Sequence, residues 1–218
     1  MTHPARVSPA PRLPAPPGVP VPALPEAELR RGFAAVLSER EAGAGVWVFA
    51  YGALLWEREF AWDEERVAEL PGLTARYCLW DERNRGTPER RSYTLGLLPG
   101  DGCAGAVLHL AETGLEDDLW KVWQHEMPPG YYRARWVDVR TGAGPVRALT
   151  FVADAGHPLY AGDVPEAEVA AVLASTSGEG GTASEYLLET ARALRERGVP
   201  DPYLERLRGP VASRAGMV

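Results

Sequence analysis

The sequence has few cysteines and histidines, and neither residue type forms a recognisable binding motif. Its two cysteines, Cys78 and Cys103, make no C-x-x-C pair. A disulfide-built secreted scaffold is therefore excluded, and a reducing compartment such as the cytoplasm is expected. The four histidines show no paired spacing, and a proline at position 129 prevents His125-Glu126 from beginning an H-E-x-x-H motif. We therefore expect no metal site.

The chain also lacks a basic excess and any long apolar run. It has 23 Lys and Arg against 30 Asp and Glu, a formal net charge of −7, which argues against a binder of phosphate backbones. One or two local arginines can still bind a small carboxylate. No apolar run approaches the roughly 18 residues of a membrane span, and the first residues do not resemble a signal peptide. A G-x-S-x-G motif is absent, so a serine hydrolase is poorly supported.

Proline is concentrated at the beginning of the sequence. Nine of the 20 prolines lie within residues 1–25, and because proline has no N–H and a fixed φ, this segment cannot continue a helix or a β-ladder. We predict a disordered or polyproline-II tail over 1–25, followed by a single domain over 26–218. The P-x-x-P spacings of the tail also suit an aromatic groove on a partner, but such spacings arise by chance at this proline density.

Beyond the tail, the hydrophobic pattern predicts strands first and helices later. A helix is expected over 26–42, where Leu29, Phe33 and Leu37 repeat at helical spacing. Short β-branched and aromatic runs predict strands at 46–51, 73–80, 92–98, 103–110, 132–139 and 146–153. Further helices are predicted at 115–127, 165–174, 183–197 and 201–208. This order favours an α+β fold, with helices outside a curled antiparallel or mixed sheet.

Glu126 stands out on the helix predicted over 115–127. Leu115, Leu119 and Val122 belong to its apolar stripe, and at about 100° per residue Glu126 lies roughly 20° from Leu115. A carboxylate on a core-facing stripe costs free energy unless it is paired or protonated, and desolvation raises its pKa toward the range of a general acid or base. The same position is equally compatible with a side chain that reaches solvent or pairs with an arginine.

Three loops carry further candidate binding groups. The segment 51–54, Tyr-Gly-Ala-Leu, follows the first predicted strand, and its small residues let backbone amides approach a carboxylate or an oxyanion. Arg85 lies in a polar loop and offers a guanidinium to an anionic substrate. The glycine-rich segment 178–181 precedes a helix, where free amides can hold an anion. Each of the three is also compatible with an ordinary turn.

These features occur together in the order of a known family. The sequence resembles the ChaC-type γ-glutamylcyclotransferases through VFAYGALLW (48–56), RGTPE (85–89), LGLLPGDGCAGAVLHL (95–110), WQHEMPPGYYRARWV (123–137), ALTFVADAGHPLYAG (148–162) and EYLLETARALRERGVPDPYLERL (185–207). The resemblance covers roughly residues 46–208. Its specificity lies in the collinear order of these segments rather than in any one of them.

The resemblance implies a small β-barrel with surrounding helices. It also implies cleavage of glutathione into 5-oxoproline and cysteinylglycine, without a metal or organic cofactor. The catalytic residue that it implies is Glu126. The substrate-binding residues that it implies are Tyr51, Gly52, Ala53, Leu54, Arg85 and Tyr132, the last in preference to Tyr131. Three positions depart from the family pattern, and they bear on substrate identity more than on the reaction: Ala53 for Ser, His125 for Arg and Ala183 for Asn.

Two other functions stay open at this point. One is a cyclotransferase for other γ-glutamyl amines or amino acids, since the sequence does not show the shape of the pocket. The other is a non-catalytic module that holds a γ-glutamyl metabolite while the proline-rich tail recruits a partner. The position of Glu126 favours an enzyme. We expect a cytoplasmic monomer or weak homodimer that binds a small molecule and neither nucleic acid nor membrane.

Overall fold

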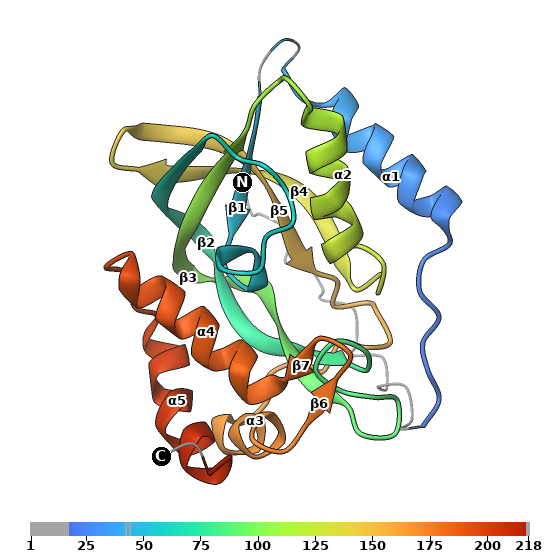
Figure 1. Ribbon diagram of the computed structural model, residues 1–218, viewed down its shortest axis with the longest axis vertical. Helices are drawn as coiled ribbons and strands as arrows, with labels where there is room; N and C mark the ends of the chain where they lie inside the picture. The colour runs from blue at the N-terminus through green and yellow to red at the C-terminus, as the bar shows by residue number, and fades with distance from the viewer. Residues whose placement is uncertain (1–17, 42, 44, 217–218) are drawn as a thin grey trace, which may run out of the picture.

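A closed five-stranded β-barrel forms the centre of the computed structural model, which describes residues 18–41, 43 and 45–216 (Figure 1). The barrel strands are β1 (Val46–Ala50), β2 (Glu64–Asp81), β3 (Ser92–Leu110), β4 (Tyr132–Thr141) and β5 (Gly144–Ala153). The helices are α1 (Glu26–Ser38), α2 (Leu115–Glu126), α3 (Glu166–Leu173), α4 (Ala183–Glu196) and α5 (Pro202–Arg214). A 3-10 helix, η1 (Ala53–Leu55), follows β1, and β6 (Ser177–Gly178) and β7 (Gly181–Thr182) form a hairpin. The predicted α+β barrel with outer helices is confirmed.

The barrel closes through a parallel pairing of β1 with β5, and a second parallel contact joins Leu97 of β3 to Val152 of β5. The strand order is β1-β3-β2-β4-β5, and β5 returns to β1. The β1–β5 pairing is parallel and joins Trp47 to Ala148 and Val48 to Leu149, whereas the other neighbours in the order are antiparallel. The sheet is therefore mixed and curled, and alternate side chains of each strand face a common interior.

Strands β2 and β3 are longer than the hydrophobic pattern predicts. Two separate strands were expected over 92–98 and 103–110, yet β3 is continuous, and β2 begins at Glu64 rather than at residue 73. A register shift between Pro71 and Leu73 skips Gly72, whose φ is +77°, and Gly102 pairs with Pro71 at a φ of +141°. The predicted break is wrong because this bulge accommodates residues with poor strand geometry while the two strands bend around the barrel.

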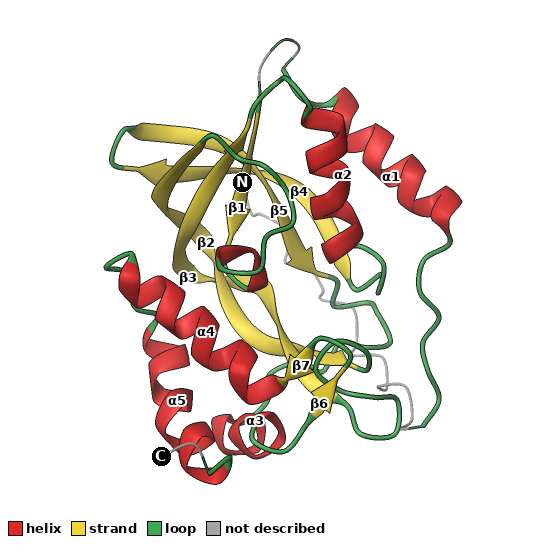
Figure 2. Ribbon diagram, viewed as in Figure 1, coloured by secondary structure: helices red, strands yellow, loops and turns green. Residues whose placement is uncertain are grey.

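Helices cover two regions of the barrel, as Figures 1 and 2 show. Helices α1 and α2 lie side by side, and Phe33 of α1 packs edge-on against Trp120 and Trp123 of α2 at ring-centroid distances of 5.0 and 5.8 Å. Helices α3, α4 and α5 gather at the other end, near the β6–β7 hairpin. The end of α2 and the start of α4 therefore belong to two different groups of helices.

The last two helices, α4 and α5, each begin at a residue whose side chain caps the helix. At the start of α4, the hydroxyl of Thr182 accepts a hydrogen bond from the amide of Glu185. At the start of α5, the carboxylate of Asp201 accepts two amides and Pro202 occupies the first turn. Helix α5 continues to Arg214, beyond the predicted end at 208. The proline at position 210 lies inside the helix and does not terminate it.

Residues 18–25, the end of the segment predicted as a tail, run without helix or strand to the start of α1 and hydrogen-bond to two loops of the domain. Residues 1–17 lie outside the described residues. Within the described ranges, none of the helices is long and apolar enough to span a membrane.

Candidate active site

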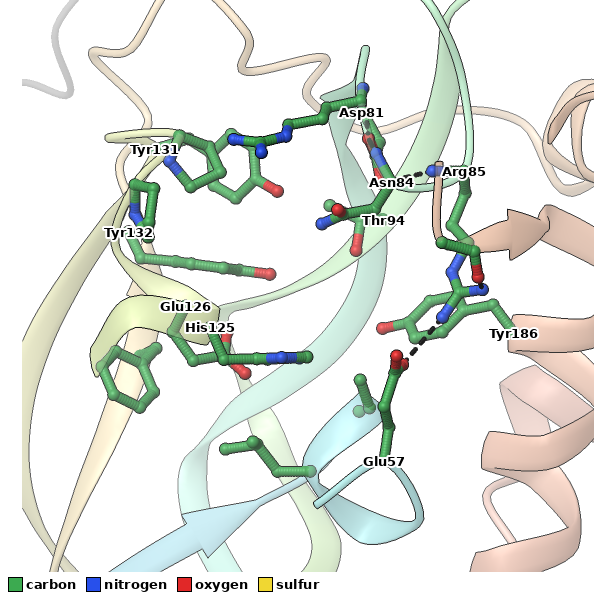
Figure 3. A pocket seen from close by; sticks show the side chains of 18 of the residues that line it. Glu57, Asp81, Asn84, Arg85, Thr94, His125, Glu126, Tyr131, Tyr132 and Tyr186 are labelled. Atoms are coloured by element: carbon green, nitrogen blue, oxygen red, sulfur yellow. Dashed lines mark hydrogen bonds and ion pairs between the residues drawn. The ribbon is translucent and has the colours of Figure 1, made fainter. Parts of the chain in front are cut away.

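A cavity of about 260 Å³ is lined by the end of β1, η1, the loop after β2, the end of α2, the start of β4 and residues of α4 (Figure 3). Segments far apart in the sequence therefore contribute to one wall. The volume lies close to the lower end of the range of small-molecule sites, about 300 to 1,000 Å³. A cavity of this size suits a metabolite rather than a polymer.

Glu126 is the last residue of α2 and lies in the cavity wall. The residues of α2 that are buried, Leu115, Leu119, Val122 and Trp123, form its apolar stripe. Glu126 itself is only half-buried, and it makes no hydrogen bond or ion pair with any residue that the structure describes. Burial is the main cause that raises the pKa of Glu126; the charge of Glu57 adds to this effect and that of His125 opposes it. The cavity thus contains a carboxyl group that has a raised proton affinity and no hydrogen-bond or ion-pair partner among the described residues.

In the 51–54 segment, the ring of Tyr51 is anchored by a hydrogen bond, and a side chain at position 52 would meet Tyr186. The hydroxyl of Tyr51 donates to the carbonyl of Phe151 at 2.7 Å, which ties the end of β1 to β5. A Cβ at Gly52 would lie 2.9 Å from the hydroxyl oxygen of Tyr186. Real Cβ contacts are not that short, so a larger residue at 52 would displace the Tyr186 ring or the turn.

The amides at the beginning of η1 have no hydrogen-bond partner among the described residues. Those of residues 55–57 donate to the carbonyls of Gly52 and Ala53 at 2.7–3.0 Å. The amides of residues 52–54 precede them, at the position where a helix leaves its N–H groups without an internal partner. None of the hydrogen bonds found in the described residues uses these three amides. A small cluster of amides therefore lies in the wall that also contains Glu126.

Asp81, at the end of β2, shapes the loop that carries Arg85. Its carboxylate accepts the amides of Arg83 and Asn84 at 2.9 and 2.8 Å and that of Arg85 at 3.2 Å. Burial raises the pKa of Asp81, and the three amides oppose the rise. This side chain-to-backbone turn fixes the point from which the Arg85 side chain extends.

The guanidinium of Arg85 is held on several sides. Its Nη2 donates to Oε2 of Glu57 at 2.8 Å, and its Nη1 donates to the carbonyl of Gly180. The guanidinium carbon lies 5.5 and 5.6 Å from the ring centroids of Tyr186 and Trp56. Arg85 is therefore a fixed charge in the cavity wall that Glu57 partly neutralises.

Four buried tyrosines surround the cavity: Tyr51, Tyr131, Tyr132 and Tyr186. Burial is the main cause that raises the pKa of each hydroxyl, so all four remain neutral and can donate hydrogen bonds. The hydroxyl of Tyr132 donates to the carbonyl of Leu95 at 2.5 Å. Figure 3 shows the hydroxyls of Tyr132 and Tyr186 pointing into the cavity from opposite sides.

All seven residues predicted for the site line this one cavity: Glu126, Tyr51, Gly52, Ala53, Leu54, Arg85 and Tyr132. The lack of an ion pair at Glu126 within the described residues contradicts the alternative in which it is a buried salt-bridge partner. For the 178–181 segment, the structure favours the alternative of an ordinary loop that leads to a capped helix over an anion site. The amides of Glu179 and Gly180 donate to the carbonyls of Arg83 and Asn84, so they are not available to an anion.

Metal and thiol chemistry have no visible basis in the part of the chain that the structure describes. It holds no group of three or more His, Cys, Asp or Glu side chains placed to bind a metal ion. Cys78 and Cys103 are buried free thiols, and burial raises the pKa of each to about 12. Thiols of this kind are unreactive because they do not form the thiolate at neutral pH.

The sequence matches the family described as ChaC-like protein over residues 46–214. This chain belongs to the ChaC-like family. It is 32% identical over 175 residues to the glutathione-specific γ-glutamylcyclotransferase of Escherichia coli K12. The aligned region covers 80% of this chain and 76% of that protein. It is 29% identical over 168 residues to glutathione-specific γ-glutamylcyclotransferase 1 of Danio rerio. That alignment covers 74% of this chain and 86% of the relative.

The fold of this ChaC-like chain is similar to that of a solved yeast protein. A crystal structure of the γ-glutamylcyclotransferase specific to glutathione from yeast superposes with a TM-score of 0.73 and 17% identity, over 81% of this chain and 99% of that one. At such low identity the likeness establishes the shared fold. The barrel and its outer helices are thus a ChaC-like architecture.

Two of the three departures from the ChaC-like pattern lie in the cavity wall. Ala53 begins η1, and His125 is exposed beside Glu126; both line the cavity. Ala183, the third, is buried at the start of α4 and is not a lining residue. Substitutions at 53 and 125 can therefore act on a ligand directly, whereas Ala183 acts only through packing.

Sequence reasoning missed Glu57 and Tyr186. Tyr186 lies on the buried face of α4, and its place on that stripe was the available signal. Glu57 had no such signal, because it follows the quoted loop by one residue and resembles any exposed glutamate. Only the turn of η1 brings its carboxylate to Arg85.

Proposed function

We propose that this protein is a γ-glutamylcyclotransferase that cleaves glutathione into 5-oxoproline and cysteinylglycine. The observation that carries the proposal is Glu126, a half-buried carboxyl group in the wall of a metabolite-sized cavity, which pairs with none of the residues from 18 to 216 that the structure describes. Membership of the ChaC-like family, and relatives that are glutathione-specific γ-glutamylcyclotransferases, support the substrate. The four tyrosines supply apolar ring surface around the same carboxyl group.

In the first step, the nucleophile is the α-amine of the substrate itself. The α-amine of the γ-glutamyl group is mostly protonated at neutral pH, and the Glu126 carboxylate takes one proton from it. The freed amine attacks the γ-carbonyl carbon and closes a five-membered ring. A carboxyl group whose pKa is raised holds this proton better than an ordinary glutamate does, and acid–base catalysis of this kind contributes about 10²–10⁴-fold.

The tetrahedral intermediate carries an oxyanion that needs fixed donors. The amides of residues 52–54 are the candidates, because they lie in the cavity wall without partners among the described residues. Donors that are already oriented stabilise developing charge without reorganisation. Since these are backbone groups, the change from serine to Ala53 leaves them in place.

Collapse of the intermediate breaks the bond between the γ-carbon and the cysteine nitrogen. Glu126, now protonated, donates its proton to that leaving nitrogen and returns to the carboxylate. The ring nitrogen, which carries two protons after the attack, releases one of them to water and becomes the lactam N–H. The products are 5-oxoproline, whose ring holds the former α-amine, and cysteinylglycine. Tyr132 and Arg85 then have positioning roles, because the first is anchored to Leu95 and the second to Glu57. Holding the γ-glutamyl chain in its ring-closing conformer supplies much of the remaining acceleration.

The cytoplasm is the compartment that this reaction favours, since its glutathione pool keeps thiols reduced. One chain contains every residue used above, so a monomer suffices for the reaction. The buried free state of Cys78 and Cys103 is compatible with such a compartment.

The direct test is release of 5-oxoproline from purified protein. Glutathione, a panel of γ-glutamyl amino acids and γ-glutamyl amines are offered separately, with cysteinylglycine measured in parallel. Equal release of both products from glutathione supports the proposal. Release only from another member of the panel changes the substrate and keeps the mechanism. No release from any compound rejects the enzyme and favours a module that binds a γ-glutamyl metabolite.

A further inference from the structure

The segment 18–25, which we call the strap, lies between two loops of the candidate site. Figure 1 shows this dark-blue segment running from the loop that joins β2 and β3 to the beginning of α1. Its sequence, G-V-P-V-P-A-L-P, contains three prolines, and an extended proline-rich segment is stiff and has little conformational entropy to lose. Such a segment can hold two loops at a defined separation.

At one end, the strap is fastened to the 82–91 loop, which carries Arg85. The amide of Val21 donates to Oε1 of Glu82 at 2.5 Å, and Oε2 of Glu82 accepts from Nε of Arg91 at 3.0 Å. Arg91 also donates to the carbonyl of Val19 at 3.0 Å. The side chains of Glu82 and Arg91 are only 9% and 6% exposed. A buried ion pair therefore fastens the strap to both ends of the loop.

At the other end, the strap is fastened to the 128–130 turn, which directly follows Glu126. The amide of Leu24 donates to the carbonyl of Pro128 at 2.8 Å. The side chain of Leu24 packs over Gly130, where an added Cβ would come within 3.2 Å of it. Gly130 has a φ of +79°, so the turn already has a conformation that favours glycine.

The strap is separated from the active-site cavity by one layer of residues. Beneath Pro20, Val21 and Ala23 lies a groove. Its floor shares five residues with the wall of the active-site cavity: Asp81, Arg83, Asn84, Pro129 and Tyr131. A displacement of the strap is therefore transmitted through these shared residues to the side chains that face the ligand.

We propose that the strap is a positioning element for the reaction assigned above: through Val21 and Leu24 it sets the distance between the Arg85 loop and the turn that follows Glu126. This inference rests on the proposed function. It differs from the expectation for a passive tail, whose removal leaves turnover unchanged. It also assigns the proline-rich segment to the chain's own site rather than to a partner.

Two deletions separate the strap from the residues before it. Removal of 1–17 leaves the strap in place and is expected to leave kcat and KM for glutathione within about twofold of the full chain. Removal of 1–25 is expected to lower kcat about tenfold, since a misplacement of about 1 Å in a reacting group can cost far more than that. Helix α1 keeps its packing on α2 through Phe33 in both deletions.

A matched pair of point variants covers the case in which the longer deletion does not fold. Val21→Pro removes the N–H that binds Glu82, whereas Ala23→Pro removes an N–H that makes none of the hydrogen bonds in the described residues. Both positions follow a proline, so the backbone before each is already restricted in the same way. We expect Val21→Pro to lower kcat several-fold and Ala23→Pro to have no effect.

The measurement is kcat and KM for 5-oxoproline release at a temperature well below the melting temperature of every variant. A purely structural strap would lower Tm and leave kcat per folded molecule unchanged, whereas a positioning strap lowers kcat at full folding. Normal kinetics for Val21→Pro, or a loss already present after removal of 1–17, overturns the inference. A full chain that releases no 5-oxoproline rejects the proposed function instead, so the two failures are distinguishable.

Discussion

Arg85 and Glu57 form an ion pair in the wall of the cavity, with Nη2 and Oε2 separated by 2.8 Å. The side chain of Arg85 is 7% exposed and that of Glu57 is 39% exposed, so the pair connects a buried cation to the accessible side of the site. Arg85 is thus not an unopposed charge awaiting a substrate carboxylate. Its pairing also places a second carboxylate near Glu126, where it affects the proton affinity of that residue.

Replacement of Glu57 by glutamine is expected to move the acidic limb of the pH profile to lower pH. Glu126 must be ionised to accept a proton, so kcat/KM rises as pH increases through its pKa, which burial and Glu57 raise. Glu57→Gln removes one nearby negative charge and leaves Arg85 without its anionic partner. Both changes favour the Glu126 carboxylate.

The measurement is kcat/KM for glutathione across the acidic range. Glu59→Gln is the matched control, because Glu59 is exposed and does not line the cavity. A limb that stays in place in Glu57→Gln, or moves to higher pH, contradicts the electrostatic coupling of Glu57 and Glu126.

Glu126→Gln is expected to abolish turnover while the fold is kept. Glutamine preserves the size of the side chain and cannot accept a proton, so kcat for 5-oxoproline release falls by about 10²–10⁴-fold or more. Glu116→Gln, on the exposed face of the same helix, is the control and retains activity. Substantial turnover by a well-folded Glu126→Gln protein would falsify the catalytic assignment.

The same substitution is expected to stabilise the protein at neutral pH. The folded state raises the pKa of Glu126, so ionisation costs stability as pH rises from the ordinary glutamate range through the raised value. Removing the half-buried carboxylate by Glu126→Gln should raise Tm by about 2–4 °C, the effect of about 1 kcal/mol in a chain of this size. Below the ordinary glutamate range the difference should vanish. A lower Tm at neutral pH would instead indicate that the carboxylate stabilises the fold.

Gly52→Ala is expected to damage the site through Tyr186. The added Cβ would lie 2.9 Å from the hydroxyl oxygen of Tyr186, and the resulting shift should reduce kcat/KM by about tenfold or more. Tyr186→Phe removes the oxygen that the Cβ meets. We therefore expect the double variant to lose less than the sum of the two single losses in free energy, measured as a double-mutant cycle. Strict additivity would show that the contact is not the cause.

Ala53→Ser restores the residue that the ChaC-like pattern usually has. If the amides of residues 52–54 bind the oxyanion, the side chain at 53 contributes little, and kcat should change by less than about threefold. KM for glutathione is measured with kcat, since a hydroxyl that binds substrate would lower KM selectively. A large rise in kcat would transfer the oxyanion role from the backbone to the serine hydroxyl.

The local sequence was sufficient to predict where most elements lie. The apolar spacing of α2 placed Glu126 at the end of its buried stripe, and α4 and α5 begin at or next to their predicted first residues, 183 and 201, where Thr182 and Asp201 cap them. Such signals act over a few residues, through side-chain periodicity and hydrogen bonds to nearby amides. They failed in β2 and β3, where a bulge at Pro71 and Gly72 is stabilised by pairing with a distant strand.

The collinear motifs of the sequence by themselves determined the family and seven of the residues that line the cavity. Only the tertiary structure decided that Glu57 pairs with Arg85, that Tyr186 limits the size of residue 52, and that residues 18–25 fasten two loops together. The physical reason is the closure of the barrel. It brings together groups that are far apart in the chain, and no local propensity or periodicity carries information about which of them will meet.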